Sequence, residues 1–172
     1  MKIVMMEGDL SDDYLRFAQQ IGVDGLDIND PLKVPYVRER GYPDLDGLLK
    51  LKKRIREAGL DIFRLTLPSP KRYLRGEPNG EEDLQGTSKA LECFGKASIP
   101  IAVVPVHWEL NPGQLGGFER SHRGGYRMFA FSLERMRKQI AETTGVLNKG
   151  MPIDDYLDRC VKLYDMLIPI AE

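Results

Sequence analysis

The pattern that decides the fold first occurs as Gln20-Ile21-Gly22-Val23-Asp24-Gly25-Leu26-Asp27-Ile28, where a polar-faced helix ends at a small residue and an apolar strand follows. The same pattern recurs at residues 57–65 and 96–104. Its small residues stand at positions 22, 59 and 98, which are 37 and 39 positions apart. This spacing is the length of one βα unit, and strands that alternate with helices predict a parallel sheet.

Working outward from these three places gives four βα units. The predicted strands cover about residues 2–6, 25–28, 60–67 and 101–107, and the predicted helices cover 11–21, 44–58, 81–97 and 152–172. Four units are half of an eight-stranded (β/α) barrel, because a complete barrel needs about 250 residues. We therefore predict an α/β half barrel of the TIM-barrel type. It forms one partial domain over residues 1–172, with a long insertion loop at 108–151 that holds a short helix near 132–142.

A half barrel leaves two strand edges unpaired and a large apolar face open to water. We therefore expect a truncated product, a split gene with a partner chain that completes the barrel, or a homo-oligomer that does so. The competing interpretation is an open, doubly wound sheet of four strands with covering helices.

Composition excludes several classes of function. The chain has 25 Lys and Arg residues against 26 Asp and Glu residues, so it lacks the basic excess of a nucleic-acid binder. Its sequence has no apolar run of the roughly 18–20 residues that span a membrane, and acidic residues near the N-terminus argue against a secretory signal. Cys93 and Cys160 have neither metal nor redox spacing, and we expect buried thiols of a cytoplasmic protein.

Polar side chains replace apolar ones at the carboxyl end of each predicted strand. They are Glu7 on the first strand, Asp27 and Asn29 on the second, Arg64 and Thr66 on the third, and His107 and Glu109 on the fourth. Alternate residues of a strand share a face, and barrel enzymes keep their active sites at this rim. We therefore predict a substrate site here, with His107 and Glu109 as the catalytic candidates and Glu7, Asp27, Asn29 and Arg64 as substrate-binding candidates.

The predicted pocket assigns each strand an inner and an outer face. Ile3 and Met5 are expected to face inward in line with Glu7, as Ile101, Val103 and Pro105 do in line with His107. The residues expected to pack against helices are Leu26, Ile28, Phe63, Leu65, Leu67, Val104 and Val106. The alternative is that Asp27 and Arg64 form a structural ion pair and that His107 is a satisfied strand-end histidine.

The insertion contains a second candidate binding segment at residues 118–129, in which basic residues flank a Gly-Gly pair. His122, Arg123 and Arg127 are the candidates, because arginine forks match carboxylates in a bidentate manner. The alternative is a solvated basic loop. Two histidines and scattered carboxylates define no metal site, so the metal ligands stay unknown.

Residues 1–29, 41–66, 122–127 and 164–172, together with the strand end at His107, resemble the N-terminal half of mannonate dehydratase-like proteins, which belong to the xylose-isomerase-like barrels. The likeness spans essentially the whole chain. It implies a lyase that depends on a divalent metal, Mn²⁺, and converts D-mannonate to 2-keto-3-deoxygluconate and water. In that family the metal-binding His, Cys and Asp residues lie mainly in the second half, which this sequence does not contain.

Two other functions stay open. A sugar isomerase or epimerase of the same barrel superfamily would share this N-terminal half. A non-catalytic subunit of a split barrel would show no turnover by itself. We expect the 172-residue chain alone to be inactive on D-mannonate with Mn²⁺ and to be a poorly behaved monomer, because its sheet edges are open.

Overall fold

The computed structural model describes residues 1–106, 116–125, 127–147 and 152–172, and the side chains of 143–147 are not considered. The chain divides into two compact units, Met1–Val106 with Ile153–Glu172, and His107–Pro152. His107 and Glu109, the two catalytic candidates, lie outside the described residues.

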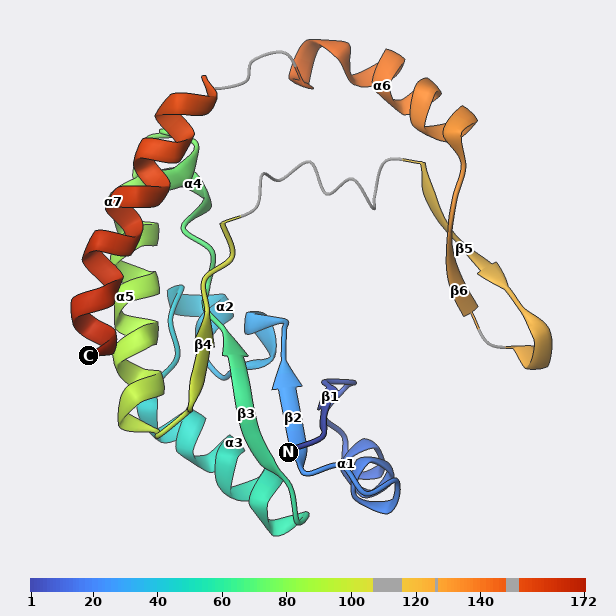
Figure 1. The fold of residues 1–172 in the computed structure, drawn as a ribbon, viewed down its shortest axis with the longest axis vertical. Coiled ribbons are helices and arrows are strands. Elements are labelled where there is room, and N and C mark those ends of the chain that lie inside the picture. Colours follow the sequence, from blue (N-terminus) through green and yellow to red (C-terminus); the bar gives the residue numbers. More distant parts are fainter. Residues whose placement is uncertain (107–115, 126, 148–151) are drawn as a thin grey trace. The chain divides into compact units, whose positions relative to one another are not determined.

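The first unit is built on one sheet of four parallel strands, β1 (Val4–Met6), β2 (Gly25–Ile28), β3 (Asp61–Thr66) and β4 (Ile101–Val103). The strands lie in chain order, β1-β2-β3-β4 (Figure 1). A doubly wound sheet reverses its strand order at a switch point, whereas a (β/α) barrel does not. The predicted half-barrel fold is therefore confirmed.

Four main helices follow these strands: α1 (Asp12–Gln20), α3 (Leu45–Glu57), α5 (Gly80–Lys96) and α7 (Ile153–Ala171). The Ser11 hydroxyl accepts a hydrogen bond from the Tyr14 N–H at 3.1 Å, so Ser11 is the N-cap of α1, as predicted. Gly22 and Gly59, which follow α1 and α3, have φ of 79° and 80°. This left-handed conformation favours glycine, and it explains the small residue in the repeated pattern.

Shorter elements lie in the connections: η1 (Pro31–Lys33) and α2 (Val37–Arg40) between β2 and α3, and α4 (Lys71–Leu74) between β3 and α5. The main core lies between the sheet and α1, α3 and α5. Its most buried side chains include Leu15, Leu26, Ile28, Leu48, Ile55, Ile62, Leu65 and Phe94. A second cluster joins α4, α5 and α7 through Tyr73, Leu74, Leu84, Leu163 and Leu167.

A β-bulge between β2 and β3 changes the predicted faces of β3. Leu26 pairs with Ile62, but the next residue, Asp27, pairs with Arg64, so Phe63 is an extra residue on β3. Ile62 is buried in the core, and the Phe63 ring lies over Gly25 on the opposite face. The prediction that Phe63 packs against the helices is therefore wrong.

The predicted faces of β1 are wrong as well. Met5 pairs with Leu26 and packs against the core, so it faces the helices. Val4 and Met6 are exposed on the other face of the sheet, on either side of Met5. A strand of three residues has too few alternating positions to fix its faces from its own sequence, and its pairing with β2 decides them.

The second unit spans the whole of the predicted insertion loop. It contains an antiparallel hairpin of β5 (Gly117–Ser121) and β6 (Arg127–Phe131), with η2 (Arg123–Gly125) between them. The predicted short helix is present as α6 (Leu133–Leu147). Gly124 and Gly125 both have positive φ and lie at the tip of the hairpin. Across the described ranges, every helix is too short or too polar to cross a membrane.

One buried lysine links α3 to the carboxyl end of α5 and provides a test of the fold. The Lys52 ammonium group on α3 donates hydrogen bonds of 2.8 Å to the carbonyl oxygens of Ala97 and Ser98, just past the end of α5. We expect Lys52→Met to lower the free energy of unfolding by about 2 kcal/mol, because two carbonyls at a negative helix end lose a charged donor. Urea denaturation followed by circular dichroism measures this loss.

The neighbouring Lys53 provides the control. Its side chain is exposed and, among the residues that the structure describes, forms only an i,i+4 ion pair with Glu57, at 3.8 Å. Lys53→Met should change the stability by less than about 0.5 kcal/mol. Equal effects of the two substitutions would contradict the role assigned to Lys52.

Candidate functional site

Asp27 and Arg64 lie side by side at the carboxyl ends of β2 and β3. They are register partners, so both side chains leave the same face of the sheet. The Arg64 Nε donates to Asp27 Oδ1 at 2.7 Å, and the Arg64 side chain is 34% exposed. The ion pair that we considered as an alternative role for these residues is therefore present, and it lies at the rim where the substrate site was predicted.

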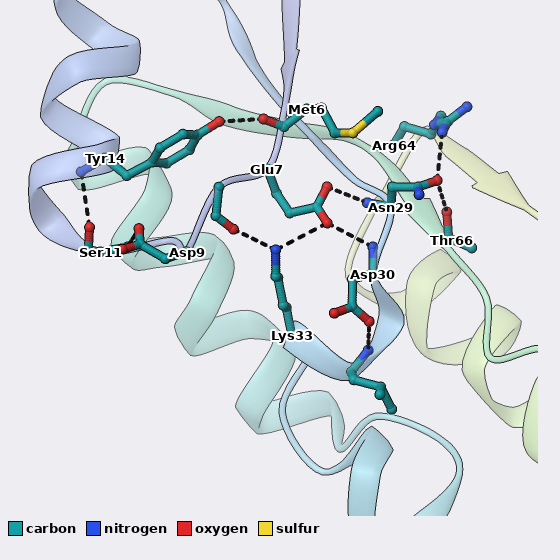
Figure 2. A network of polar contacts seen from close by, with 12 residues as sticks. Met6, Glu7, Asp9, Ser11, Tyr14, Asn29, Asp30, Lys33, Arg64 and Thr66 are labelled. Atoms are coloured by element: carbon teal, nitrogen blue, oxygen red, sulfur yellow. Dashed lines mark hydrogen bonds and ion pairs between the residues drawn. The ribbon is translucent and has the colours of Figure 1, made fainter. Parts of the chain in front are cut away.

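Asn29 extends this pair into a cluster, and Figure 2 shows its contacts with Arg64 and Thr66. Its side-chain oxygen accepts hydrogen bonds from Arg64 Nη2 at 3.3 Å and from the Thr66 hydroxyl at 3.4 Å. Thr66 is buried. We call Asp27, Asn29, Arg64 and Thr66 the rim cluster.

Glu7 lies next to the rim cluster but faces the loop that follows β2. Its carboxylate accepts hydrogen bonds from the backbone N–H groups of Asn29 at 2.8 Å and Asp30 at 2.9 Å (Figure 2). The Lys33 ammonium group lies 3.3 Å from the same carboxylate and also donates to the Gly8 carbonyl at 2.6 Å. The Glu7 side chain is only 5% exposed. Glu7, predicted to bind substrate, therefore positions Asn29 through its backbone.

The surroundings of Glu7 keep it ionised. Burial by itself would raise the pKa of this carboxyl group, but hydrogen bonds from Asn29 and Asp30 and the charge of Lys33 outweigh burial and lower the pKa below its ordinary value. The carboxylate is thus a fixed negative charge beside the loop that carries Asn29.

The rim cluster presents hydrogen-bond donors. Among the described residues, no acceptor takes a hydrogen bond from Arg64 Nη1 or from the Asn29 amide nitrogen, whereas Arg64 Nε and Nη2 have partners. A guanidinium nitrogen and an amide nitrogen side by side suit carboxylate or hydroxyl oxygens of a polar ligand. Asp27 balances the charge of Arg64 and holds its side chain in place.

The candidates of the insertion belong to the second unit. Arg127 pairs across the hairpin with Glu119 at 2.9 Å, and both side chains are largely exposed. Arg123 lies in η2, and His122 directly follows β5. The structure thus brings together Asp27, Asn29 and Arg64 in the first unit.

Two residues that shape the site, Asp30 and Lys33, were not predicted from the sequence. Lys33 contacts Glu7, and the Asp30 side chain accepts from the Leu32 N–H at 3.0 Å, which starts η1. The sequence Asn29-Asp30-Pro31 is a turn signal that could have predicted η1. Nothing local in the sequence indicates that Lys33 lies beside Glu7, 26 positions earlier.

A metal site does not form among the described residues. Within these ranges, His, Cys, Asp and Glu side chains nowhere gather in a group of three or more. Asp27 is engaged by Arg64, and Glu7 is engaged by two backbone N–H groups and Lys33. The rim cluster as described therefore does not fit a divalent metal.

The charge on Glu7 can be tested by pH. Because the folded-state pKa lies below the ordinary value of 4.5, the stabilisation is complete above that pH and is lost as the pH falls through the folded-state pKa. We expect Glu7→Gln to cost about 2 kcal/mol at pH 7, since hydrogen bonds to a charged group are the strong ones. The wild-type protein and the variant should therefore converge in stability as the pH falls below the folded-state pKa of Glu7.

Denaturation with urea at a series of pH values measures this difference. Asp13→Asn is the matched control, because the Asp13 carboxylate is almost fully exposed and, within the described ranges, has only an i,i+3 pair with Arg16. A Glu7→Gln cost that stays constant from pH 7 to pH 3 would contradict the ionised state of Glu7.

Comparison with known proteins identifies a shared fold. No protein-family model matches the chain, and no curated protein matches it in sequence. Among solved structures, the mannonate dehydratase from Streptococcus suis serotype 2 is similar, with a TM-score of 0.74 and 19% sequence identity. The match covers 99% of this chain and 50% of that protein. The chain therefore spans about half the length of that solved structure and has a mannonate dehydratase-like fold.

Proposed function

We propose that this chain contributes the substrate-binding rim of a carbohydrate lyase of the mannonate dehydratase type, with D-mannonate or a similar sugar acid as substrate. The observation that carries this proposal is the rim cluster. Its donors lie at the carboxyl ends of β2 and β3, which is where (β/α) barrels bind their substrates. The fold shared with a mannonate dehydratase supports the choice of reaction.

Three residues of the rim cluster have roles in this proposal. Arg64 binds the sugar-acid carboxylate through Nη1. Asp27 holds the guanidinium group in place by accepting a hydrogen bond from Arg64 Nε. The Asn29 amide binds a substrate hydroxyl, and Glu7 fixes the backbone of Asn29. His122, Arg123 and Arg127 are proposed as a further carboxylate-binding group on the insertion.

Dehydration of a sugar acid removes the proton beside the carboxylate and expels a hydroxyl group, so it needs a base and an acid. His107 and Glu109 are proposed for these roles. The resemblance implies a divalent metal, Mn²⁺, whose ligands we expect mainly outside this half of the barrel, and the roles above do not depend on it. Cys93 and Cys160 are free thiols, which supports a cytoplasmic location.

A sugar isomerase or epimerase is the second candidate, because it would use the same rim for the hydroxyl groups of a neutral sugar. The two candidates differ in Arg64. Arg64 Nη1 has no acceptor within the part of the chain that the structure describes, and such a guanidinium nitrogen favours an anionic substrate. D-mannonate differs from D-mannose in its carboxylate. The non-catalytic subunit is the third candidate. It would bind neither sugar.

Ligand binding tests the proposal directly. We expect the chain to bind D-mannonate more tightly than D-mannose in isothermal titration calorimetry. Arg64→Gln should weaken D-mannonate binding about tenfold or more, since loss of a charge-assisted hydrogen bond costs about 1.5–3 kcal/mol. The same substitution should leave binding of D-mannose almost unchanged.

Arg56→Gln is the matched control, because Arg56 pairs with Asp61 at 2.9 Å near the opposite end of β3. It should leave D-mannonate binding as it is in the wild-type protein. Equal affinity for the two sugars, or an Arg64→Gln variant with wild-type affinity for D-mannonate, would refute the sugar-acid assignment.

A further inference from the structure

In the first unit, most of the exposed large apolar side chains lie on the elements at the two ends of the half barrel. On the helices, α1 carries Phe17 and the adjoining Ile21 at one end, and α7 carries five at the other. Within the described residues, α3 exposes only Leu49 as a large apolar side chain, and α5 exposes none. In Figure 1, α1 lies beside β1, whereas α7 lies on the far side of α5. The apolar surface is therefore concentrated where the layers of strands and helices stop.

The exposed residues of α7 form one stripe. They are Ile153, Leu157, Val161, Tyr164 and Ile168. Their spacing of three or four positions places them along one side of the helix, as in a helix that packs against another helix. The opposite side of α7 is already used, because Leu163 and Leu167 are buried against α4 and α5. The stripe is thus a second packing face of the same helix.

The sheet has the same two open ends. β1 is hydrogen-bonded to β2 alone and β4 to β3 alone within the described sheet, so each has one free edge. The face of the sheet opposite the helices also exposes Val4 and Met6 on β1 and Ile101 on β4. Unpaired parallel strands next to exposed apolar side chains are a template for further strand pairing.

We propose that a second copy of this chain covers these surfaces, so that two half barrels close into one ring. A two-fold axis along the strands keeps all strands parallel and brings β4 of each copy beside β1 of the other. The α7 stripe of each copy then packs against Phe17 and Ile21 of its partner. This inference rests on the fold and not on the proposed function.

Two observations favour a second copy as the occupant. One chain carries both of the edges that must meet, so two copies satisfy each other at both junctions. Four strands from each copy give eight, the number at which parallel βα units close.

The mass of the full chain in solution is the first measurement. Sedimentation velocity should give twice the 19.5 kDa of one chain. We expect Val161→Glu and Phe17→Glu each to return the protein to 19.5 kDa with an unchanged circular dichroism spectrum. Both positions are exposed in the single chain, at 60% and 52%, but would be buried in the ring, where an unpaired charge is costly.

Leu49→Glu is the matched control, because Leu49 is 42% exposed on α3, away from both ends, and this variant should stay dimeric. A wild-type mass of 19.5 kDa would overturn the proposal, as would a requirement for a different polypeptide to cover the edges. A dimer that survives Phe17→Glu but not Val161→Glu would show pairing of α7 with α7, which also overturns the ring. Sugar binding is measured separately, so failure of one proposal is distinguishable from failure of the other.

Discussion

The register between β2 and β3 is the constraint on which the rest of the site depends. A bulge after the Leu26–Ile62 pair lets Ile62 and Leu65 both enter the core, although two residues separate them. The same bulge sets Arg64 opposite Asp27 on the other face. Regular pairing would place the guanidinium group on the side of the helices, where burial of its charge would be costly.

Each charged side chain at the rim has a partner of opposite charge. Asp27 compensates Arg64, and Lys33 with two backbone N–H groups compensates Glu7. Glu7 directly follows β1, and Asn29 directly follows β2. The Glu7 carboxylate therefore connects the loops that follow these two neighbouring strands. These hydrogen bonds hold Asn29 in one position relative to Arg64. A preorganised binding site requires side chains whose positions are fixed before the ligand binds.

The polar rim and the open ends have opposite requirements. The rim needs exposed donors, which cost nothing when water or a ligand accepts their hydrogen bonds. The ends of the half barrel expose apolar side chains on α1 and α7, and these gain free energy only when they are covered. Closing the strands into a ring would cover the exposed side chains of α1 and α7. It would leave the rim open, because the rim lies at the carboxyl ends of the strands, at the mouth of a (β/α) barrel.

The sequence by itself determined the parallel βα architecture, because each unit repeats a local signal: a helix cap, a small residue with left-handed backbone and an apolar strand. It also predicted that Asp27 and Arg64 share a face, since both follow apolar strand residues at the same point of the repeat. Only the tertiary structure decided the faces of Met5 and Phe63, the partners of Glu7 and the hairpin of the insertion. These features depend on strand register and on contacts between residues far apart in the chain, which local periodicity does not encode.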